Sequence, residues 1–256
     1  MCELDNRTVL LTGASSGIGA EAAALLGDAG AFLVAHYGRD AAGVERATNG
    51  IPDSRKLLVP ADFAEPGSGR TLWARALSWR GRVDVLVLNA AVQPVTPIDG
   101  ADADWDATWT RVLRVNVREP ANLLREALRH FRASGGGTVV TVSSWAAEQG
   151  SGLSELSAYA ASKAAVRAMT QMVAQIHAKD GVIAIVVAPS IVRTPMSEIS
   201  LLSRGGEEAF ATVLPLGDIV PAADVAKVVA FAAAAGANCR HLSGATLDVS
   251  GAAYVR

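Results

Sequence analysis

Residues 8–19 read Thr-Val-Leu-Leu-Thr-Gly-Ala-Ser-Ser-Gly-Ile-Gly, and a helical pattern follows over residues 17–29. The apolar run predicts a buried strand, and the glycines predict a tight turn from it into the helix. Such a turn points free backbone N–H groups and the positive end of the helix dipole at one place, where a pyrophosphate binds well. The residues expected to contact it are Gly13, Ser15, Ser16, Gly17, Ile18 and Gly19.

The glycine spacing differs from the commoner Gly-x-Gly-x-x-Gly, and a glycine-rich turn can also simply connect a strand to a helix. The surrounding pattern favours a dinucleotide site, because short apolar strands and longer helices alternate along the whole chain. The expected strands are Thr8–Thr12, Phe32–His36, Lys56–Val59, Val83–Asn89, Thr138–Ser143, Val182–Ala188 and Ala245–Val249. The expected helices cover residues 17–29, 41–48, 69–79, 104–131, 157–178 and 222–235.

This alternation predicts β-α-β units, and the continuous apolar runs suit strands that are covered on both faces. We therefore expect an α/β fold: a doubly wound, Rossmann-like parallel sheet of seven strands, with helices on both faces. Residues 1–256 are expected to form one dinucleotide-binding and catalytic domain. The Ser-, Pro- and Gly-rich segment 189–216 follows a strand's carboxyl end and is expected to cover the substrate.

The composition argues against several other kinds of protein. The net charge is −2 without a basic stripe, which argues against a nucleic-acid partner. The longest apolar runs are too short to cross a membrane, and the N-terminal residues show no leader pattern. No group of side chains has metal-ligand spacing, so no catalytic metal is expected. Cys2 and Cys239 are expected to be free thiols in a cytoplasmic protein.

Tyr159 and Lys163 stand four residues apart in a helix-forming run, so their side chains share one helix face. An ammonium beside a phenol favours the phenolate and should lower the pKa of the tyrosine from ~10 toward neutral. Such a phenol could exchange a proton with an alkoxide. An isolated Tyr-x-x-x-Lys is more often an ordinary surface pair, so this motif gains its weight from the residues around it.

Taken together, the motifs resemble those of the short-chain dehydrogenase/reductases, in their single-domain branch. The motifs that carry the resemblance are Thr12–Gly19, Asn89-Ala90-Ala91, Asn116, Ser143-Ser144, Tyr159 and Lys163. The resemblance extends from Thr8 to about Tyr254, and the chain is generally similar to 3-oxoacyl carrier-protein reductases. It implies an oxidoreductase that moves a hydride between NADP(H) or NAD(H) and a ketone or secondary alcohol.

The resemblance also implies roles for individual residues. Tyr159 would be the general acid or base, and Lys163 would tune it and bind the nicotinamide ribose. Ser144 would stabilise charge on the substrate oxygen, and Asn116 would hold a water in a proton relay.

Further residues would hold the cofactor. Asp62 would contact the adenine, and Asn89 would support the adenosine pocket. The segment 187–194 would line the nicotinamide through Pro189, Val192 and Thr194.

The sequence departs from the family pattern where Ala91, Ser190 and Ala252 replace common glycines. An added methyl is costly only if the backbone needs the left-handed region. The interval between Ser144 and Tyr159 is also about two residues longer than usual, so the loop 145–156 is expected to bulge toward the substrate cleft.

The choice between NADP and NAD depends on the end of the second strand. An acid there would bind the ribose 2′-hydroxyl, but Tyr37 occupies this position. Arg39 could pair a 2′-phosphate, with help from His36, or be a solvated loop residue. The glycine turn has Ser16 where many NADP-dependent relatives carry a basic residue. NADP is favoured over NAD because the acid is missing.

The substrate is expected to be a small carbonyl or alcohol compound, such as a medium-sized ketone or a 3-oxoacyl thioester. The residues expected to line its cleft are Val92, Gln93, Pro94, Trp145, Gln149, Leu153, Ile191 and Met196. The apolar faces of the helices over 104–131, 157–178 and 222–235 predict a homotetramer, with a dimer or burial against the sheet alone as alternatives. A catalytically silent dinucleotide sensor or scaffold is the alternative function.

Overall fold

A computed structural model of the chain describes residues 4–151, 153–202 and 205–255. Seven parallel strands form the central sheet in the order β3-β2-β1-β4-β5-β6-β9, which confirms the expected doubly wound sheet. They are β1 (Thr8–Leu11), β2 (Phe32–Tyr37), β3 (Lys56–Pro60), β4 (Val85–Leu88), β5 (Gly137–Val142), β6 (Val182–Pro189) and β9 (Thr246–Val249). The strand order reverses between β1 and β4, and open α/β sheets bind their ligands at such a reversal.

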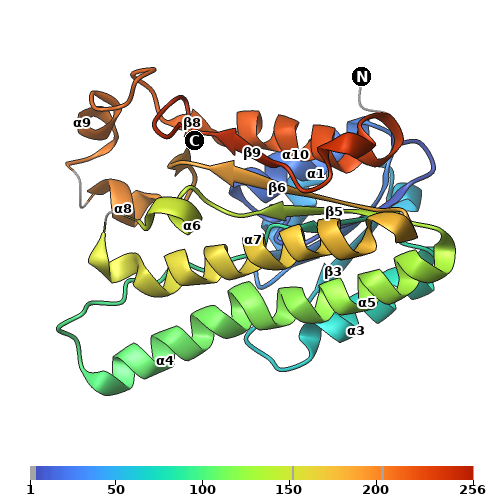
Figure 1. Cartoon of the computed structure of the whole chain (residues 1–256), viewed down its shortest axis with the longest axis horizontal. Helices are drawn as coiled ribbons and strands as arrows, with labels where there is room; N and C mark the ends of the chain where they lie inside the picture. The colour runs from blue at the N-terminus through green and yellow to red at the C-terminus, as the bar shows by residue number, and fades with distance from the viewer. Residues whose placement is uncertain (1–3, 152, 203–204, 256) are drawn as a thin grey trace.

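Helices cover both faces of the sheet (Figure 1). One layer contains α1 (Gly17–Asp28), α2 (Ala41–Ala47) and α10 (Ala222–Asn238). The other contains α3 (Ser68–Arg80), α4 (Asp102–Leu113), α5 (Glu119–Ser134) and α7 (Ser157–His177). Each layer shares its own apolar core with the sheet, because the strand side chains alternate between the two faces.

The helix expected over residues 104–131 is interrupted. The chain forms α4, then a π-helical turn at Arg114–Arg118, and then α5. A π turn inserts one extra residue and re-aims the side chains around it, and such turns are frequent at functional sites. Asn116 lies in this turn and is buried.

The segment 189–216 is more regular than expected. It contains α8 (Glu198–Leu202) and α9 (Glu207–Ala211), and a small strand, β7 (Val192–Arg193), pairs in parallel with β8 (Val220–Pro221). Leu201, Phe210 and Ile219 form a third small core beneath it. These elements are too short to show a period in the sequence. Together with α6 (Ala146–Gln149), α8 and α9 gather at the left end of the view in Figure 1.

The three missing glycines have different consequences. Ala252 adopts a left-handed backbone with φ of 62°, whereas Ala91 and Ser190 do not. Of these three residues, the backbone strain of about 1–2 kcal/mol therefore falls on Ala252 alone.

Cys239 is a half-buried free thiol, and Cys2 lies outside the described residues. Within the described ranges, no helix is long and apolar enough to cross a membrane, and no group of His, Cys, Asp and Glu could hold a metal ion.

A buried carboxylate fixes the start of α5, immediately after the π turn. Glu119 is 1% exposed and accepts hydrogen bonds from the N–H groups of Gly67 and Gly69, at 3.0 and 2.9 Å. The side-chain amide of Asn122 donates a third, at 3.0 Å. Burial raises the pKa of Glu119, but these bonds and the charge of Arg70 outweigh it, so the pKa lies below its ordinary value. The ionised carboxylate thus attaches α5 to the start of α3.

We expect Glu119→Gln to destabilise the fold by about 1–3 kcal/mol, because an amide cannot accept all three bonds through ionised oxygens. Since the pKa of Glu119 is depressed, the carboxylate's contribution to the stability of the fold is present above pH 4.5 and is lost as the pH falls below it. Urea unfolding at neutral and acid pH measures both effects. Glu126→Gln, which breaks an outer-face pair with Arg129, is the control and should cost under about 0.5 kcal/mol. Equal stability of the two variants would contradict this account.

Candidate active site

A cavity of about 650 Å³ opens at the carboxyl ends of β1, β4, β5 and β6, where the strand order reverses. Most residues singled out in the sequence line it: Gly13, Ser15, Ser16, Gly17, Ile18, Gly19, Arg39, Asp62, Asn89, Ser144, Tyr159, Lys163, Pro189, Val192 and Thr194. Two do not. Tyr37 packs against the core on the α1 side, and Asn116 lies behind the cavity wall.

Hydrogen bonds from β4 hold the glycine turn in place. The hydroxyl of Thr12 accepts the N–H groups of Asn89 and Ala90, at 2.9 and 3.0 Å. The side-chain amide of Asn89 donates back to the carbonyl oxygens of Thr12 and Gly13, both at 3.0 Å. Asn89 therefore braces the turn that leads into α1.

The turn leaves no room for side chains at its glycines. A methyl group at Gly19 would lie 1.8 Å from the carbonyl oxygen of Gly13. Gly17 has φ of +53°, and a methyl group there would lie 2.9 Å from Thr194 on the opposite wall. A turn of bare backbone at a helix N-terminus can cradle a pyrophosphate. The residues present therefore fit the pyrophosphate of a dinucleotide.

Asp62, Arg39 and His36 surround the far end of the cavity. The carboxylate of Asp62 accepts the Ala64 N–H at 2.9 Å and the Arg39 guanidinium at 3.1 Å. The Ala64 bond, more than the arginine, lowers the pKa of Asp62. The expectation that His36 helps bind a 2′-phosphate is wrong, because backbone groups of Gly13 and Ala61 occupy both of its ring nitrogens.

At the other end of the cavity, two reciprocal hydrogen bonds join β5 to α7. The ammonium of Lys163 donates to the carbonyl oxygen of Val142 at 2.8 Å. The hydroxyl of Ser143 donates to the carbonyl oxygen of Lys163 at 2.9 Å. Ser143 thus has a role that the sequence did not reveal: it fixes the end of the strand that carries Ser144 against the helix that carries Tyr159.

Ser144, Tyr159 and Lys163 meet in this corner. The hydroxyl of Ser144 accepts the Ala146 N–H at 3.2 Å, and Ser144 also bonds the Tyr159 hydroxyl. The Lys163 ammonium lies 5.7 Å from the centre of the Tyr159 ring. A phenol, a hydroxyl and an ammonium therefore line one end of the cavity together.

Burial shifts two of these groups toward their neutral forms. It raises the pKa of Tyr159 to about 12, although the bond to Ser144 opposes the shift. It lowers the pKa of Lys163 to about 8. The expectation that Lys163 lowers the tyrosine pKa is wrong for this structure, because desolvation of the phenolate is the larger effect. The phenol is a proton donor at neutral pH.

Asn116 holds the cleft wall instead of facing the cavity. Its side-chain amide accepts the N–H of Val92 at 2.8 Å and donates to the carbonyl oxygen of Val92 at 2.9 Å. It also donates to the hydroxyl of Ser162 at 3.0 Å, which in turn donates to the Tyr159 carbonyl oxygen at 2.7 Å. Ser162, another residue that sequence reasoning missed, thus connects Asn116 to the helix of Tyr159.

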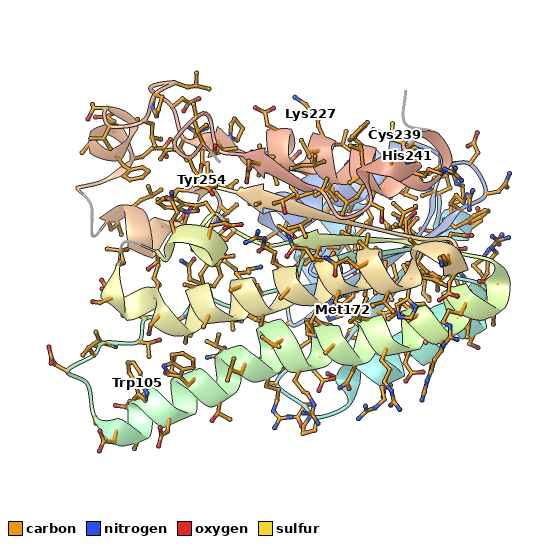
Figure 2. The ribbon with its side chains drawn as sticks, viewed as in Figure 1. Trp105, Met172, Lys227, Cys239, His241 and Tyr254 are labelled. Carbon is orange, nitrogen blue, oxygen red and sulfur yellow. The ribbon has the colours of Figure 1, made fainter. Side chains whose placement is uncertain are left out.

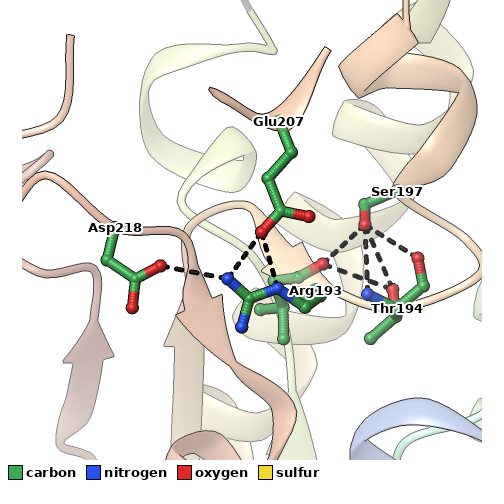
Figure 3. A network of polar contacts seen from close by, with 6 residues as sticks. Arg193, Thr194, Ser197, Glu207 and Asp218 are labelled. Carbon is green, nitrogen blue, oxygen red and sulfur yellow. Dashed lines mark hydrogen bonds and ion pairs between the residues drawn. The ribbon is translucent and has the colours of Figure 1, made fainter. Parts of the chain in front are cut away.

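A polar network holds the opposite wall (Figure 3). The hydroxyl of Ser197 donates to the carbonyl oxygens of Val192 and Thr194, at 2.6 and 2.9 Å. Beside it, Arg193 pairs with Glu207 of α9 and, at 3.0 Å, with Asp218 before β8. Val192 and Thr194 are therefore held by bonds within their own segment.

The substrate end is mostly apolar. Of the expected cleft residues, Val92, Gln93, Trp145, Leu153, Ile191 and Met196 line the cavity, whereas Pro94 and Gln149 do not. The loop 145–156 contributes to this wall as expected.

Sequence reasoning missed Arg111 of α4, which also lines the cavity. Its charge helps to lower the pKa of Asp62.

The chain is similar to known proteins over most of its length. Residues 7–202 match the family described as short chain dehydrogenase. The chain is 34% identical over 248 residues to cis-4-hydroxycyclohexanecarboxylate dehydrogenase of Sinomonas cyclohexanicum, covering 96% of this chain and 95% of that protein.

Two solved structures have a similar fold over nearly the whole chain. A 3-oxoacyl (acyl-carrier-protein) reductase of Agrobacterium tumefaciens with NADP bound has a TM-score of 0.86 at 29% identity, covering 97% of this chain and 95% of that one. A 3-ketoacyl-(acyl-carrier-protein) reductase of Brucella melitensis complexed with NADH has a TM-score of 0.83 at 27% identity, covering 97% and 98%.

The fold and the site thus define an oxidoreductase that acts on an alcohol or a ketone. The chain belongs to the short-chain dehydrogenase/reductase family.

Proposed function

We propose that the protein transfers a hydride between NADP(H) and an uncharged ketone or secondary alcohol, with Tyr159 as the general acid or base. The observation that carries this proposal is the meeting of Ser144, Tyr159 and Lys163 at one end of a cavity whose other end is the glycine turn. A bound nicotinamide dinucleotide supplies the hydride or accepts it.

The chain's own residues move the proton. In ketone reduction, the Tyr159 hydroxyl donates its proton to the substrate oxygen, and in alcohol oxidation its phenolate takes the proton back. The Ser144 hydroxyl donates a hydrogen bond to the oxygen on which negative charge develops. Lys163 would bind the nicotinamide ribose. Asn116 holds the cleft wall at Val92 and, through Ser162, the helix turn of Tyr159. A relay water to Lys163 would bind beside it.

The dinucleotide would extend from this corner to the glycine turn. Its pyrophosphate would lie over Gly13, Gly17 and Gly19, with Ser15, Ser16 and Ile18 beside it. Asp62 and Asn89 would border the adenosine. Pro189, Val192 and Thr194 would face the nicotinamide.

Charge near the adenosine end supports NADP over NAD. No carboxylate ends β2, since Tyr37 stands there and packs toward the core. Arg39 lines the cavity, and its side chain is 87% exposed, so it can turn from Asp62 to a 2′-phosphate.

The lining of the substrate end supports an uncharged substrate. Among the described residues at this end, Lys163 alone carries a formal charge. The other nearby cation, Arg111, belongs to the adenosine end, where its charge helps to lower the pKa of Asp62. An apolar wall binds a ring or chain by burial of its surface.

Exposed apolar side chains on the helices support a homotetramer. Leu113 of α4 and Met172 and Ile176 of α7 are 40–65% exposed, and Phe231 of α10 is 40% exposed. Met172 is labelled on α7 in Figure 2, where Trp105 marks the start of α4. We further propose that all elements form one domain and that the protein works in the cytoplasm.

Tyr159→Phe is expected to reduce hydride transfer by about 10²–10⁴-fold, because it removes the proton donor and keeps the ring. The measurement is a panel of ketones and secondary alcohols assayed with NADPH and with NADH. Dinucleotide affinity should persist, since the hydroxyl is the only group lost. Wild-type turnover by this variant would refute the proposal. Dinucleotide binding without turnover by the wild type on the whole panel would favour a silent sensor.

Arg39→Ala is expected to raise the KM for NADPH by roughly ten-fold and to leave the KM for NADH unchanged, because only a 2′-phosphate gains a charge-assisted bond. Steady-state kinetics with both dinucleotides measure the effect. Arg46→Ala removes an equal charge from the exposed face of α2 and serves as the control. A similar rise for both dinucleotides would contradict the proposed preference.

A further inference from the structure

The imidazole of His36 joins two segments that are distant in the sequence. Its Nδ1 accepts the N–H of Gly13 at 3.1 Å, and its Nε2 lies 2.9 Å from the carbonyl oxygen of Ala61. An amide N–H only donates and a carbonyl only accepts, so the ring is neutral and carries its proton on Nε2. The side chain therefore bridges the glycine turn after β1 and the end of β3.

The bridge is rigid because the ring is packed as well as bonded. It stacks on Phe63 with ring centres 4.4 Å apart and 11° between the planes. His36 is 2% exposed, and its own carbonyl oxygen accepts the Ala14 N–H at 2.8 Å. Burial lowers the pKa of His36 to about 4, against the opposing effect of the Ala61 carbonyl. One residue thus holds two successive residues of the turn, and its ring stays neutral at physiological pH.

Both segments joined by this bridge are walls of the cavity. Gly13 lies on the pyrophosphate side, and Ala61, Asp62 and Phe63 lie on the adenosine side. His36 lines the cavity beneath them. Each wall is also bonded to the backbone of β2, since the Ala14 N–H donates to the His36 carbonyl oxygen and the Ala61 N–H to the Tyr37 carbonyl oxygen. The His36 ring adds the direct side-chain bond between the two walls.

We propose that His36 is a positioning residue for dinucleotide binding, which sets the width of the adenosine end by bridging Gly13 to Ala61. This inference rests on the proposed function, because it takes the cavity to hold a dinucleotide. Without the bridge, the walls can relax apart, and binding must bring them together at a cost in affinity. NADPH and NADH share the adenosine that lies between these walls, so both lose affinity equally. This equality distinguishes a positioning residue from a phosphate contact.

Three substitutions separate the parts of the bridge. His36→Phe keeps a ring that can stack on Phe63 but removes both hydrogen bonds. His36→Asn keeps an acceptor near the position of Nδ1, within reach of Gly13. His36→Gln places its amide near the position of Nε2, within reach of Ala61, and gives up the Gly13 bond. His130→Phe is the matched control, since His130 also accepts a backbone N–H, that of Val83 at 3.3 Å, but lies outside this cavity.

The experiment is a calorimetric titration of each folded variant with NADPH and with NADH, which measures the two dissociation constants. Circular dichroism checks that each variant is folded. We expect His36→Phe to raise both dissociation constants by roughly ten-fold or more, because a buried donor and a buried acceptor each lose a partner. His36→Asn and His36→Gln each keep one of the two bonds and therefore break the bridge, so both should raise the two dissociation constants, by less than His36→Phe does. His130→Phe should bind both dinucleotides like the wild type.

Three results would overturn the inference. One is wild-type affinity in folded His36→Phe, and another is a loss confined to NADPH. If His36→Phe does not fold, wild-type affinity of both folded His36→Asn and folded His36→Gln decides against it. A wild-type protein that binds neither dinucleotide would remove the proposed function and this inference together, and so is distinct from these three.

Discussion

The reciprocal bonds between the end of β5 and α7 are the constraint on which the catalytic corner depends. Lys163 donates to the carbonyl oxygen of Val142, and Ser143 donates to the carbonyl oxygen of Lys163. Because both bonds are buried, the strand and the helix cannot slide past each other without leaving polar groups unpaired. Ser144 comes just after this strand, and Tyr159 lies in this helix. The bonds between the two elements therefore bring the two side chains together.

The same device recurs around the cavity. Asn89 braces the glycine turn, Asn116 clamps Val92, and Ser197 holds the segment that carries Val192 and Thr194. In each case a short buried or half-buried polar side chain binds backbone groups of a loop. Loops fixed in this way keep their shape before a ligand arrives, which lowers the cost of binding and of orienting the reacting groups.

The sequence predicted the large elements and the residues of the motifs because their signals are periodic or local. The continuous apolar strands and the turn at Gly13–Gly19 are of this kind. The π turn at Asn116 and the pair β7–β8 were not predictable, since they depend on contacts with residues far along the chain. The same is true of the roles of Ser143, Ser162 and His36. The predicted direction of the Tyr159 pKa shift was wrong, because a sequence motif shows the neighbouring charge but not the burial of the phenol.

The central claim is that Ser144, Tyr159 and Lys163 converge on the reactive ring of a nicotinamide dinucleotide. A crystal structure of the protein with reduced dinucleotide tests it most directly. We expect the nicotinamide between this corner and Val192–Thr194, with the pyrophosphate over the glycine turn and the Tyr159 oxygen bonded to Ser144. A nicotinamide bound elsewhere, or a Tyr159 hydroxyl turned away from both Ser144 and Lys163, would contradict it.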